Sequence, residues 1–452
     1  MLLPVVRVGI VHVNGETAGA EPLVPFGGMK GSSSWSREQG AASQDFDTQP
    51  GPCTGMAAAG PALRRRHRGP VVTGRSGSGS GSGSGDDVPP DGVEGTHLRL
   101  RRAADLLMAH QFRGWFYGDS IGFEGLLAAS ELFGDLRWQG FAHGFLRGWA
   151  ARQDGYRELD NTAPGRALCL LVERTGDGLL LDAGIALATW LRSRPTIGDG
   201  AYVSFGSAPL REPYGGPPLP PDEAALLTDP GPGAYLDCLH FDPPFLVHLG
   251  RLAGDDGLME AGVGQALAYV TMLQDPGSGL FRHFWLERTG RPYVLGWARG
   301  QGWALLGLLD VLEGLPHEHP ARPRLVTSAR LLADAMAGLQ RSDGSWWAVA
   351  QEPASGPESS TAAFMAAAFP RGIELGVLPE EPFRSAGRRA WDATLAHLDA
   401  SGALTDVSAA VWSSTSPTTT ITCHAASSSV GAGPAPPRRR IVGHGRTRGR
   451  HP

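Results

Sequence analysis

Apolar residues recur every three or four positions along most of the chain beyond Leu98. Such a repeat places an apolar stripe along one face of a helix, because an α-helix completes a turn in 3.6 residues. The alternation of apolar and polar residues that is typical of strands is weak in the same region. The pattern predicts about eleven helices, over residues 98–112, 123–133, 135–153, 164–176, 178–193, 235–252, 256–274, 298–314, 322–340, 358–376 and 380–399.

The connections between these segments carry Gly, Pro and Asp, as in QDPGSG, ERTGRP and RSDGSW. Short turns of this composition join consecutive helices into antiparallel hairpins. The sequence therefore predicts an all-α toroid of helical hairpins. A closed ring of six hairpins needs twelve helices, and the apolar pattern ends at Trp412. We accordingly expect a ring that lacks its last helix.

Two flanking segments differ from this region in composition. Residues 1–96 are rich in Gly, Ser, Pro and Ala, and residues 413–452 accumulate Arg and Pro. Segments of this kind bury too little apolar surface to offset the entropy lost on ordering the chain. We expect a disordered N-terminal segment over 1–96, a catalytic domain over 97–412 and a disordered tail over 413–452.

Composition narrows the class of protein and of partner. The net charge is −5 and the pI is near 6.3, which gives no general electrostatic footprint for nucleic acid. The four cysteines, Cys53, Cys169, Cys238 and Cys423, are spaced too irregularly for a disulfide framework or a zinc site. No apolar run approaches the roughly 18 residues of a membrane span. These features predict a soluble, cytoplasmic protein that binds neither nucleic acid nor membrane.

Two aspartates stand where helices are expected to begin, Asp160 in RELDNTAPGRALCLL and Asp237 in GAYLDCLHFDPPFLVHLG. Cleavage of glycosides usually needs two carboxyl groups near the scissile bond. Asp is also a favoured helix cap, which stabilises a helix by about 1 kcal/mol without any catalytic role. Around Asp237 the residues Tyr235 and His240 add aromatic surface, which favours a role in a site.

A second group of candidate residues lies between two of the predicted helices, in GLFRHFWLERTGRPYVLGWARGQGWALL. His283, Trp297, Arg299 and Trp303 combine aromatic planes, which stack on sugars, with a guanidinium fork that fits a carboxylate. Trp115 in RGWFYGDSIGFEG has a similar character. The alternative is that both tryptophans are core aromatics and that Arg299 binds helix carbonyls. The pattern favours an acidic sugar as ligand.

These residues resemble the unsaturated glucuronyl and unsaturated rhamnogalacturonyl hydrolases, glycoside hydrolase families 88 and 105. The matching pieces are LDNTAPGRAL, YLDCLHFDPPFL, DPGSGLFRHFW, GWARGQGWAL, RSDGSWW and ESSTAAFMAAAFPRGIELG, in the family's order. The resemblance implies an (α/α)6 six-hairpin barrel that needs no metal or organic cofactor. Two departures are the loss of the pattern after Val411 and Trp412, and an insert over 196–232 without a clear counterpart.

The resemblance also implies a reaction. A family member removes a 4,5-unsaturated uronic acid from the non-reducing end of an oligosaccharide that a polysaccharide lyase has produced. By analogy, Asp237 protonates the C4=C5 bond and directs water to C5, and Asp160 is the second essential carboxylate. His283, Trp297, Arg299 and Trp303 then hold the unsaturated uronate.

Two other functions compete with this interpretation. One is a sugar epimerase or isomerase on the same barrel, although only His283 is well placed for the paired histidines that such enzymes use. The other is a non-catalytic, truncated relic. The parent polysaccharide, the linkage and the oligomeric state are open at this point.

Overall fold

The computed structural model describes residues 93–112, 117–152, 165–206 and 221–408. All of them belong to one unit, Asp86–Pro452. Two predicted site residues, Trp115 and Asp160, lie outside the described residues. The segments for which the sequence predicts disorder lie almost entirely outside them too.

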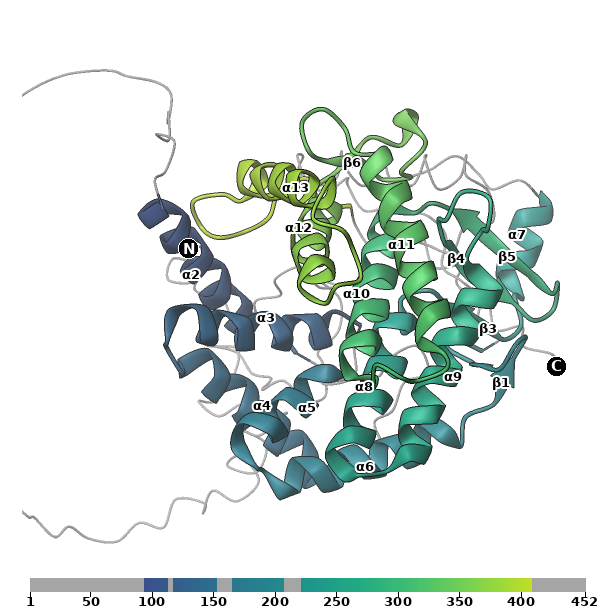
Figure 1. Ribbon diagram of the computed structural model, residues 1–452, viewed down its shortest axis with the longest axis horizontal. Coiled ribbons are helices and arrows are strands. Elements are labelled where there is room, and N and C mark those ends of the chain that lie inside the picture. Colours follow the sequence, from purple (N-terminus) through teal and green to yellow (C-terminus); the bar gives the residue numbers. More distant parts are fainter. Residues whose placement is uncertain (1–92, 113–116, 153–164, 207–220, 409–452) are drawn as a thin grey trace, which may run out of the picture. The chain divides into compact units, whose positions relative to one another are not determined.

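Eleven long helices follow one another in the described part of the chain, where the apolar repeat predicts them (Figure 1). They are α2 (Val93–Met108), α3 (Tyr117–Phe133), α4 (Arg137–Arg152), α5 (Arg166–Thr175), α6 (Gly178–Arg192), α8 (Cys238–Ala253), α9 (Asp256–Leu273), α10 (Ala298–Gly314), α11 (Arg322–Gly338), α12 (Ser359–Glu374) and α13 (Phe383–His397). A further short helix, α7 (Pro221–Thr228), lies in the insert. The predicted helical fold is confirmed.

The largest difference in a boundary occurs at α3, which begins at Tyr117 and not at the predicted Phe123. Its first turn holds Asp119 and Ser120, which are 0% and 2% exposed. A search for apolar periodicity passes over buried polar residues, so it places the start of this helix too late.

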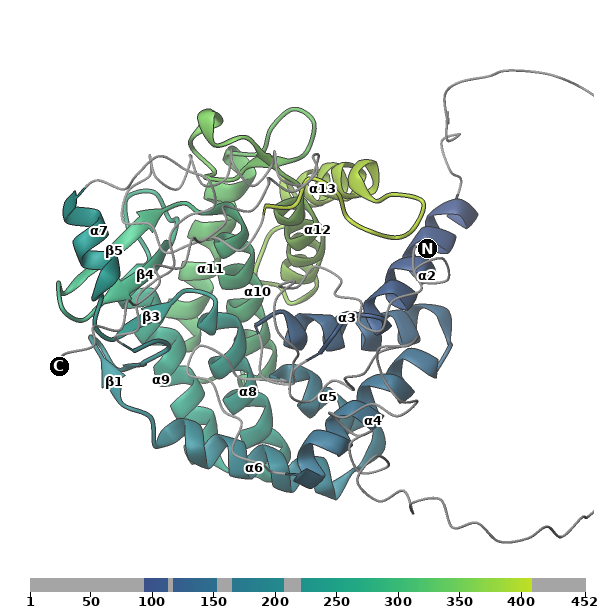
Figure 2. The same ribbon diagram turned by 180° about the vertical axis from the view of Figure 1, so that it is seen from behind.

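The helices form two layers. Helices α3, α5, α8, α10 and α12 contact one another in this order and make the inner layer. Helices α4, α6, α9, α11 and α13 each pack on the inner helix that precedes them. Figures 1 and 2 show α8 to α11 side by side in this arrangement. Because each outer helix runs back along its partner, the inner helices all begin at the same end of the barrel.

Helix α2, the first of the outer layer, contacts the end of α13, the last of that layer. It packs on α3 and α4. Arg99 donates hydrogen bonds to the carbonyl oxygens of Leu395 and Leu398, at 3.2 and 3.0 Å, at the C-terminal end of α13. The outer layer therefore closes on itself, with six outer and five inner helices among the described residues. The expected place of a sixth inner helix comes after Ser408, outside these residues.

The structure also contains short strands that the sequence analysis did not expect. A three-stranded antiparallel sheet is built from β3 (Gly233–Tyr235), β4 (Arg282–Leu286) and β5 (Arg291–Leu295). The remaining strands form two-residue pairs, β1 (Thr196–Ile197) with β2 (Ala201–Tyr202) and β6 (Trp346–Trp347) with β7 (Pro357–Glu358). Strands of two to five residues are too short to give a periodic signal. The larger sheet ends directly before α8 and α10.

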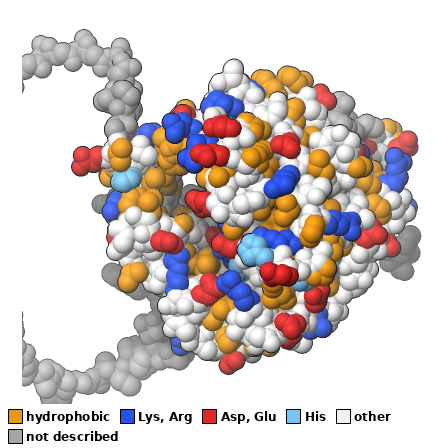
Figure 3. Space-filling model, in the orientation of Figure 1, with side chains coloured by type: hydrophobic (Ala, Val, Ile, Leu, Met, Phe, Trp, Pro, Cys, Tyr) orange, Lys and Arg blue, Asp and Glu red, His pale blue; other side chains and the backbone are white. Residues whose placement is uncertain are grey.

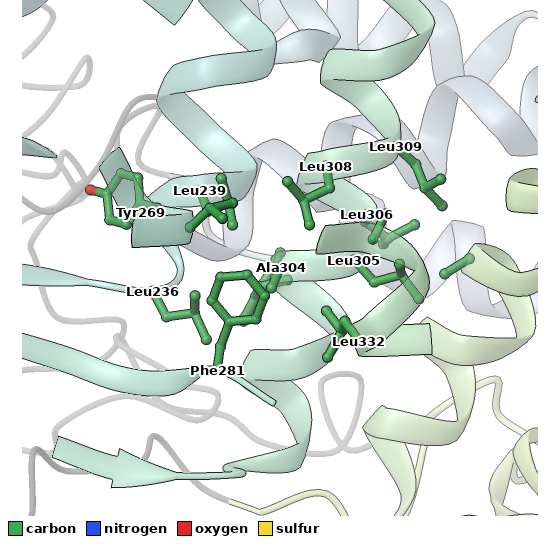
Figure 4. Close-up of a cluster of buried hydrophobic side chains, with 14 of the residues drawn as sticks. Leu236, Leu239, Tyr269, Phe281, Ala304, Leu305, Leu306, Leu308, Leu309 and Leu332 are labelled. Carbon is green, nitrogen blue, oxygen red and sulfur yellow. The ribbon is translucent and has the colours of Figure 1, made fainter. Parts of the chain in front are cut away.

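The core lies between the inner and outer layers. Figure 4 shows leucines of α8, α10 and α11 meeting Phe281, which precedes β4. Leu239, Leu305 and Leu332 are fully buried there. Burial of such a side chain contributes about 2 kcal/mol. The same packing holds the starts of α8 and α10 together.

The surface is mixed in charge. Figure 3 shows arginines and acidic side chains interspersed with apolar ones on the face in view. Among the described helices, none is long and apolar enough to cross a bilayer.

Candidate active site

Asp237 lies at the junction of β3 and α8, at the end of the barrel where the inner helices begin. It occupies the N-cap position of α8, but its side chain makes no capping hydrogen bond to that helix. The carboxylate oxygen Oδ2 instead lies 3.8 Å from Nε2 of His283, and the Asp237 side chain is 16% exposed. Capping, the structural alternative for this residue, is therefore not what the carboxylate does.

The sheet explains why Asp237 and His283 meet. In the register of β3 and β4, Tyr235 pairs with Phe284. The next backbone group along β3, the N–H of Leu236, donates to the carbonyl oxygen of His283 at 2.8 Å. Asp237 follows immediately, so strand pairing brings its side chain to the imidazole.

Aromatic rings surround this pair. The ring centroid of His283 lies 4.3 Å from that of Trp297 and 5.6 Å from that of Tyr235. Trp297 is the residue before α10, and a bridge to Val349 holds its backbone. The structure thus brings together four residues that the sequence singles out, from β3, β4 and the starts of α8 and α10.

Arg299 stands in the first turn of α10, with its guanidinium carbon 5.7 Å from the centre of the Trp297 ring. It donates a hydrogen bond of 2.9 Å to the carbonyl oxygen of Ser408 and another to the Ser408 hydroxyl. Ser408 lies beyond α13, the last described helix, and a role of Arg299 in substrate binding stays a prediction. Despite burial, which opposes ionisation, Arg299 and hydrogen bonds from Ser360 and Thr361 lower the pKa of Glu358.

His240 and Trp303 lie one turn further along α8 and α10. They are 2% and 3% exposed, and their ring centroids are 5.1 Å apart. Trp297 is similarly buried, at 4% exposed. This burial agrees with the alternative in which both tryptophans are core aromatics, and their part in substrate binding stays a prediction.

A group of charged side chains that the sequence analysis did not single out converges inside the inner layer. We call it the axial cluster: Glu124 of α3, Arg166 of α5, His240 of α8, Asp310 of α10 and Arg371 of α12. Only His240 appears among the predicted site residues. The sequence feature that could have pointed to this cluster is a single charged residue within an otherwise apolar helix, such as Asp310 in WALLGLLDVLEG.

Both arginines of the axial cluster bind Asp310. Arg166 Nη1 lies 2.9 Å from Asp310 Oδ1, and Arg371 contacts the same oxygen. Burial opposes ionisation of Asp310, but Arg371 and Arg166 lower its pKa. Glu124, His240 and Asp310 offer donor atoms within 4.8 Å of one another, and they are the set that metal-ligand geometry selects among the described residues.

The comparisons with known proteins agree with this architecture. The sequence profile described as Glycosyl Hydrolase Family 88 matches residues 98–416. Unsaturated rhamnogalacturonyl hydrolase YesR of Bacillus subtilis is 25% identical over 262 residues, which cover 56% of this chain and 70% of YesR.

Solved structures share the fold. A possible GH105 member from Salmonella enterica superposes with a TM-score of 0.59 at 17% identity, over 76% of this chain and 96% of that one. The unsaturated glucuronyl hydrolase of Bacillus sp. GL1 superposes with a TM-score of 0.51 at 18% identity, over 74% and 94%. The shared architecture is the α/α barrel that the resemblance implies. Since the family profile spans most of the chain, the protein belongs to glycoside hydrolase family 88.

Proposed function

We propose that this glycosidase removes 4,5-unsaturated uronic acid from the non-reducing end of lyase-generated oligosaccharides by hydrating the vinyl ether. The observation that carries the proposal is the Asp237 carboxylate, turned to His283 and away from the backbone of α8. YesR is named as acting on unsaturated rhamnogalacturonides, and the Bacillus sp. GL1 enzyme as degrading glycosaminoglycan. The two names share an unsaturated uronyl substrate and differ in the parent polymer.

In the proposed reaction Asp237 acts first as an acid. Its proton passes to C4 of the C4=C5 bond, and positive charge develops on C5 and the ring oxygen. Water then adds to C5 while the Asp237 carboxylate accepts one of its protons. The resulting hemiketal opens to a ketone at C5, and the hemiacetal left at C1 expels the next sugar as an alcohol. One water is consumed, and the enzyme returns to its starting protonation state.

The surroundings of Asp237 suit this sequence of steps. The imidazole of His283, 3.8 Å from Oδ2, is placed to steady the carboxylate once it has lost its proton. The starts of inner helices attract the anionic carboxylate of a uronate, because their N–H groups and dipoles point toward it. We assign Tyr235, Trp297 and Arg299 to the uronate and its ring on these grounds.

Four more predicted residues complete the proposal with less structural support. His240 and Trp303 lie one turn deeper, and their assignment to substrate binding rests on the sequence pattern and, for Trp303, also on the resemblance. Asp160 is proposed as the second essential carboxylate and Trp115 as a stacking residue, although neither is among the described residues. We further infer a cytoplasmic site of action from the irregular cysteine spacing, which cell fractionation tests.

The test is Asp237→Asn, assayed on unsaturated disaccharides from rhamnogalacturonan and from glycosaminoglycans. We expect kcat to fall by about 10³-fold, within the range for loss of a general acid, with an unchanged melting temperature. The matched control is Asp255→Asn, because the Asp255 side chain does cap a helix, accepting hydrogen bonds from Gly257 and Leu258 at the start of α9. This control should keep full activity. Turnover by Asp237→Asn close to that of the wild type would refute the assignment.

A further inference from the structure

Counted together with Glu313 of α10, the acids and arginines of the axial cluster carry five charges when all are ionised, three negative and two positive. Arg166 and Arg371 both bind Asp310, and both also contact Glu313, the acidic residue one turn further along α10. Two guanidinium groups therefore face two carboxylates. An ionised Glu124 would add a third negative charge without a matching positive one, in surroundings where an unpaired charge is costly.

His240 stands between the carboxylates of Glu124 and Asp310. Its Nε2 lies 3.7 Å from Glu124 Oε2, and its Nδ1 lies 3.6 Å from Asp310 Oδ2. Among the described residues, neither ring nitrogen has a hydrogen-bond partner. Because the ring is 2% exposed, its two nitrogens need polar partners within the protein.

One added proton balances the cluster better than a divalent cation does. A proton brings the sum of charges to zero, whereas a divalent ion beside two arginines leaves an excess positive charge. The geometry agrees, because His240 presents a different nitrogen to each carboxylate, at 3.7 and 3.6 Å. A metal ion would take one ring nitrogen of His240, whereas here each carboxylate faces a different ring nitrogen.

We propose that Glu124 is kept as a neutral carboxylic acid and that, with His240, it acts as a positioning residue for Asp237. This inference rests on the proposed function of Asp237. His240 carries the link, because its backbone N–H donates to the Asp237 carbonyl oxygen at 2.9 Å in the first turn of α8. When Glu124 loses its proton, its carboxylate and that of Asp310 repel each other across His240. This repulsion displaces the first turn of α8, which carries Asp237.

The ionisation of the groups that face Glu124 supports this assignment. Burial, together with the Asp310 carboxylate, raises the pKa of Glu124 to about 8. Burial lowers the pKa of His240 to about 4. The other charged or titratable groups of the five inner helices at this place are Arg166, His248, Asp310, Glu313 and Arg371.

The test compares the pH profile of kcat/KM for the full chain and for Glu124→Gln, whose side chain has the same shape and stays neutral. We expect the wild type to lose activity about tenfold for each pH unit above 8, as one ionisation demands. In Glu124→Gln the break near pH 8 should be absent, so that the profile keeps only the limbs that other groups cause. The readout is the shape of the profile and not its height.

The matched control is Glu131→Gln, on the same helix but with its side chain 75% exposed, which should keep the limb. Thermal melts provide a readout that does not depend on Asp237. Because the pKa of Glu124 is raised on folding, its proton stabilises the fold at low pH, and this contribution is lost as pH rises through about 8. Glu124→Gln should lack that fall in melting temperature.

Three results would overturn the inference. The first is an unchanged alkaline limb in Glu124→Gln, or in His240→Asn if the glutamine variant does not fold. The second is a melting temperature that, between pH 6.5 and 9, falls no more in the wild type and in the Glu131→Gln control than in Glu124→Gln. The third is one equivalent of a divalent metal in the purified protein, lost in His240→Asn and kept in His248→Gln. Activity of Asp237→Asn would instead contradict the proposed function and leave the melts informative.

Discussion

A carboxylate at the start of a helix can cap the helix or serve a site, and the described residues contain both kinds. Asp177 and Asp255 accept hydrogen bonds from backbone N–H groups of α6 and α9. Asp237 has the same position in α8 but is directed at His283. Residue type and position in the sequence are the same in these cases, and what separates Asp237 is that its side chain makes no capping hydrogen bond.

That contact depends on the pairing of β3 with β4, which joins residues far apart in the chain. Sequence reasoning could propose Asp237 and His283 one at a time, from their neighbours and from the family motifs. It could not place them side by side, because a strand of three residues gives no periodic signal. The axial cluster could not be predicted for a related reason, because its charged residues come from five separate helices and meet only in the folded barrel.

Removal of one arginine from the axial cluster should be costly. Arg371→Met leaves Asp310, 1% exposed, with a single guanidinium partner, and we expect a loss of about 3 kcal/mol in the free energy of unfolding. The control is Arg384→Met, whose partner Glu380 is 63% exposed, with an expected loss below about 1 kcal/mol. Urea titrations followed by circular dichroism measure both. Equal losses in the two variants would mean that Asp310 does not need both arginines.

At the scale of elements, the long helices were predictable because each must present an apolar stripe to a neighbour. Eleven of them appear where the repeat places them. Helix α7 and the three-stranded sheet were not foreseen. The sheet depends on cross-strand contacts, as between Phe284 and Tyr293, which have no counterpart in a pattern along one segment.

Helices α8 and α10 approach each other closely at Gly307. A Cβ atom there would lie 2.4 Å from the carbonyl oxygen of Leu239, a backbone atom. We expect Gly307→Ala to lower the free energy of unfolding by about 1–3 kcal/mol, because the two helices must separate.

Gly264 provides the control for Gly307. It is exposed on α9, and a Cβ atom there meets nothing within 4 Å. Gly264→Ala should raise stability by about 0.5–1 kcal/mol through helix propensity alone. Thermal melts of both variants test the pair. A Gly307→Ala protein as stable as Gly264→Ala would contradict the close packing of α8 and α10.

For the whole molecule, acid should destabilise the fold. Burial lowers the pKa of His240 to about 4, so the stability that comes from keeping it neutral is present above its ordinary value of 6.5 and is lost as pH falls toward 4. The pKa of Glu358 is lowered, as are those of Asp177 and Asp399, so their contributions are lost as pH falls below the usual carboxyl range. In Glu124→Gln, where the opposing contribution of the Glu124 proton is absent, melting temperatures should therefore fall from pH 6.5 downward. An unchanged melting temperature at pH 4 would contradict this.

The family, the barrel and the glycosidase class now have a common explanation in a ring of inner helices whose starts meet a small sheet. The central claim is that the reaction begins at the C4=C5 bond and not at the glycosidic carbon. Time-resolved NMR of an unsaturated disaccharide turned over in D2O tests it most directly. We predict one deuterium added stereospecifically at C4 of the first product, together with loss of the double bond as the next sugar is released. Release of a uronic acid that still carries the C4=C5 bond would contradict the account.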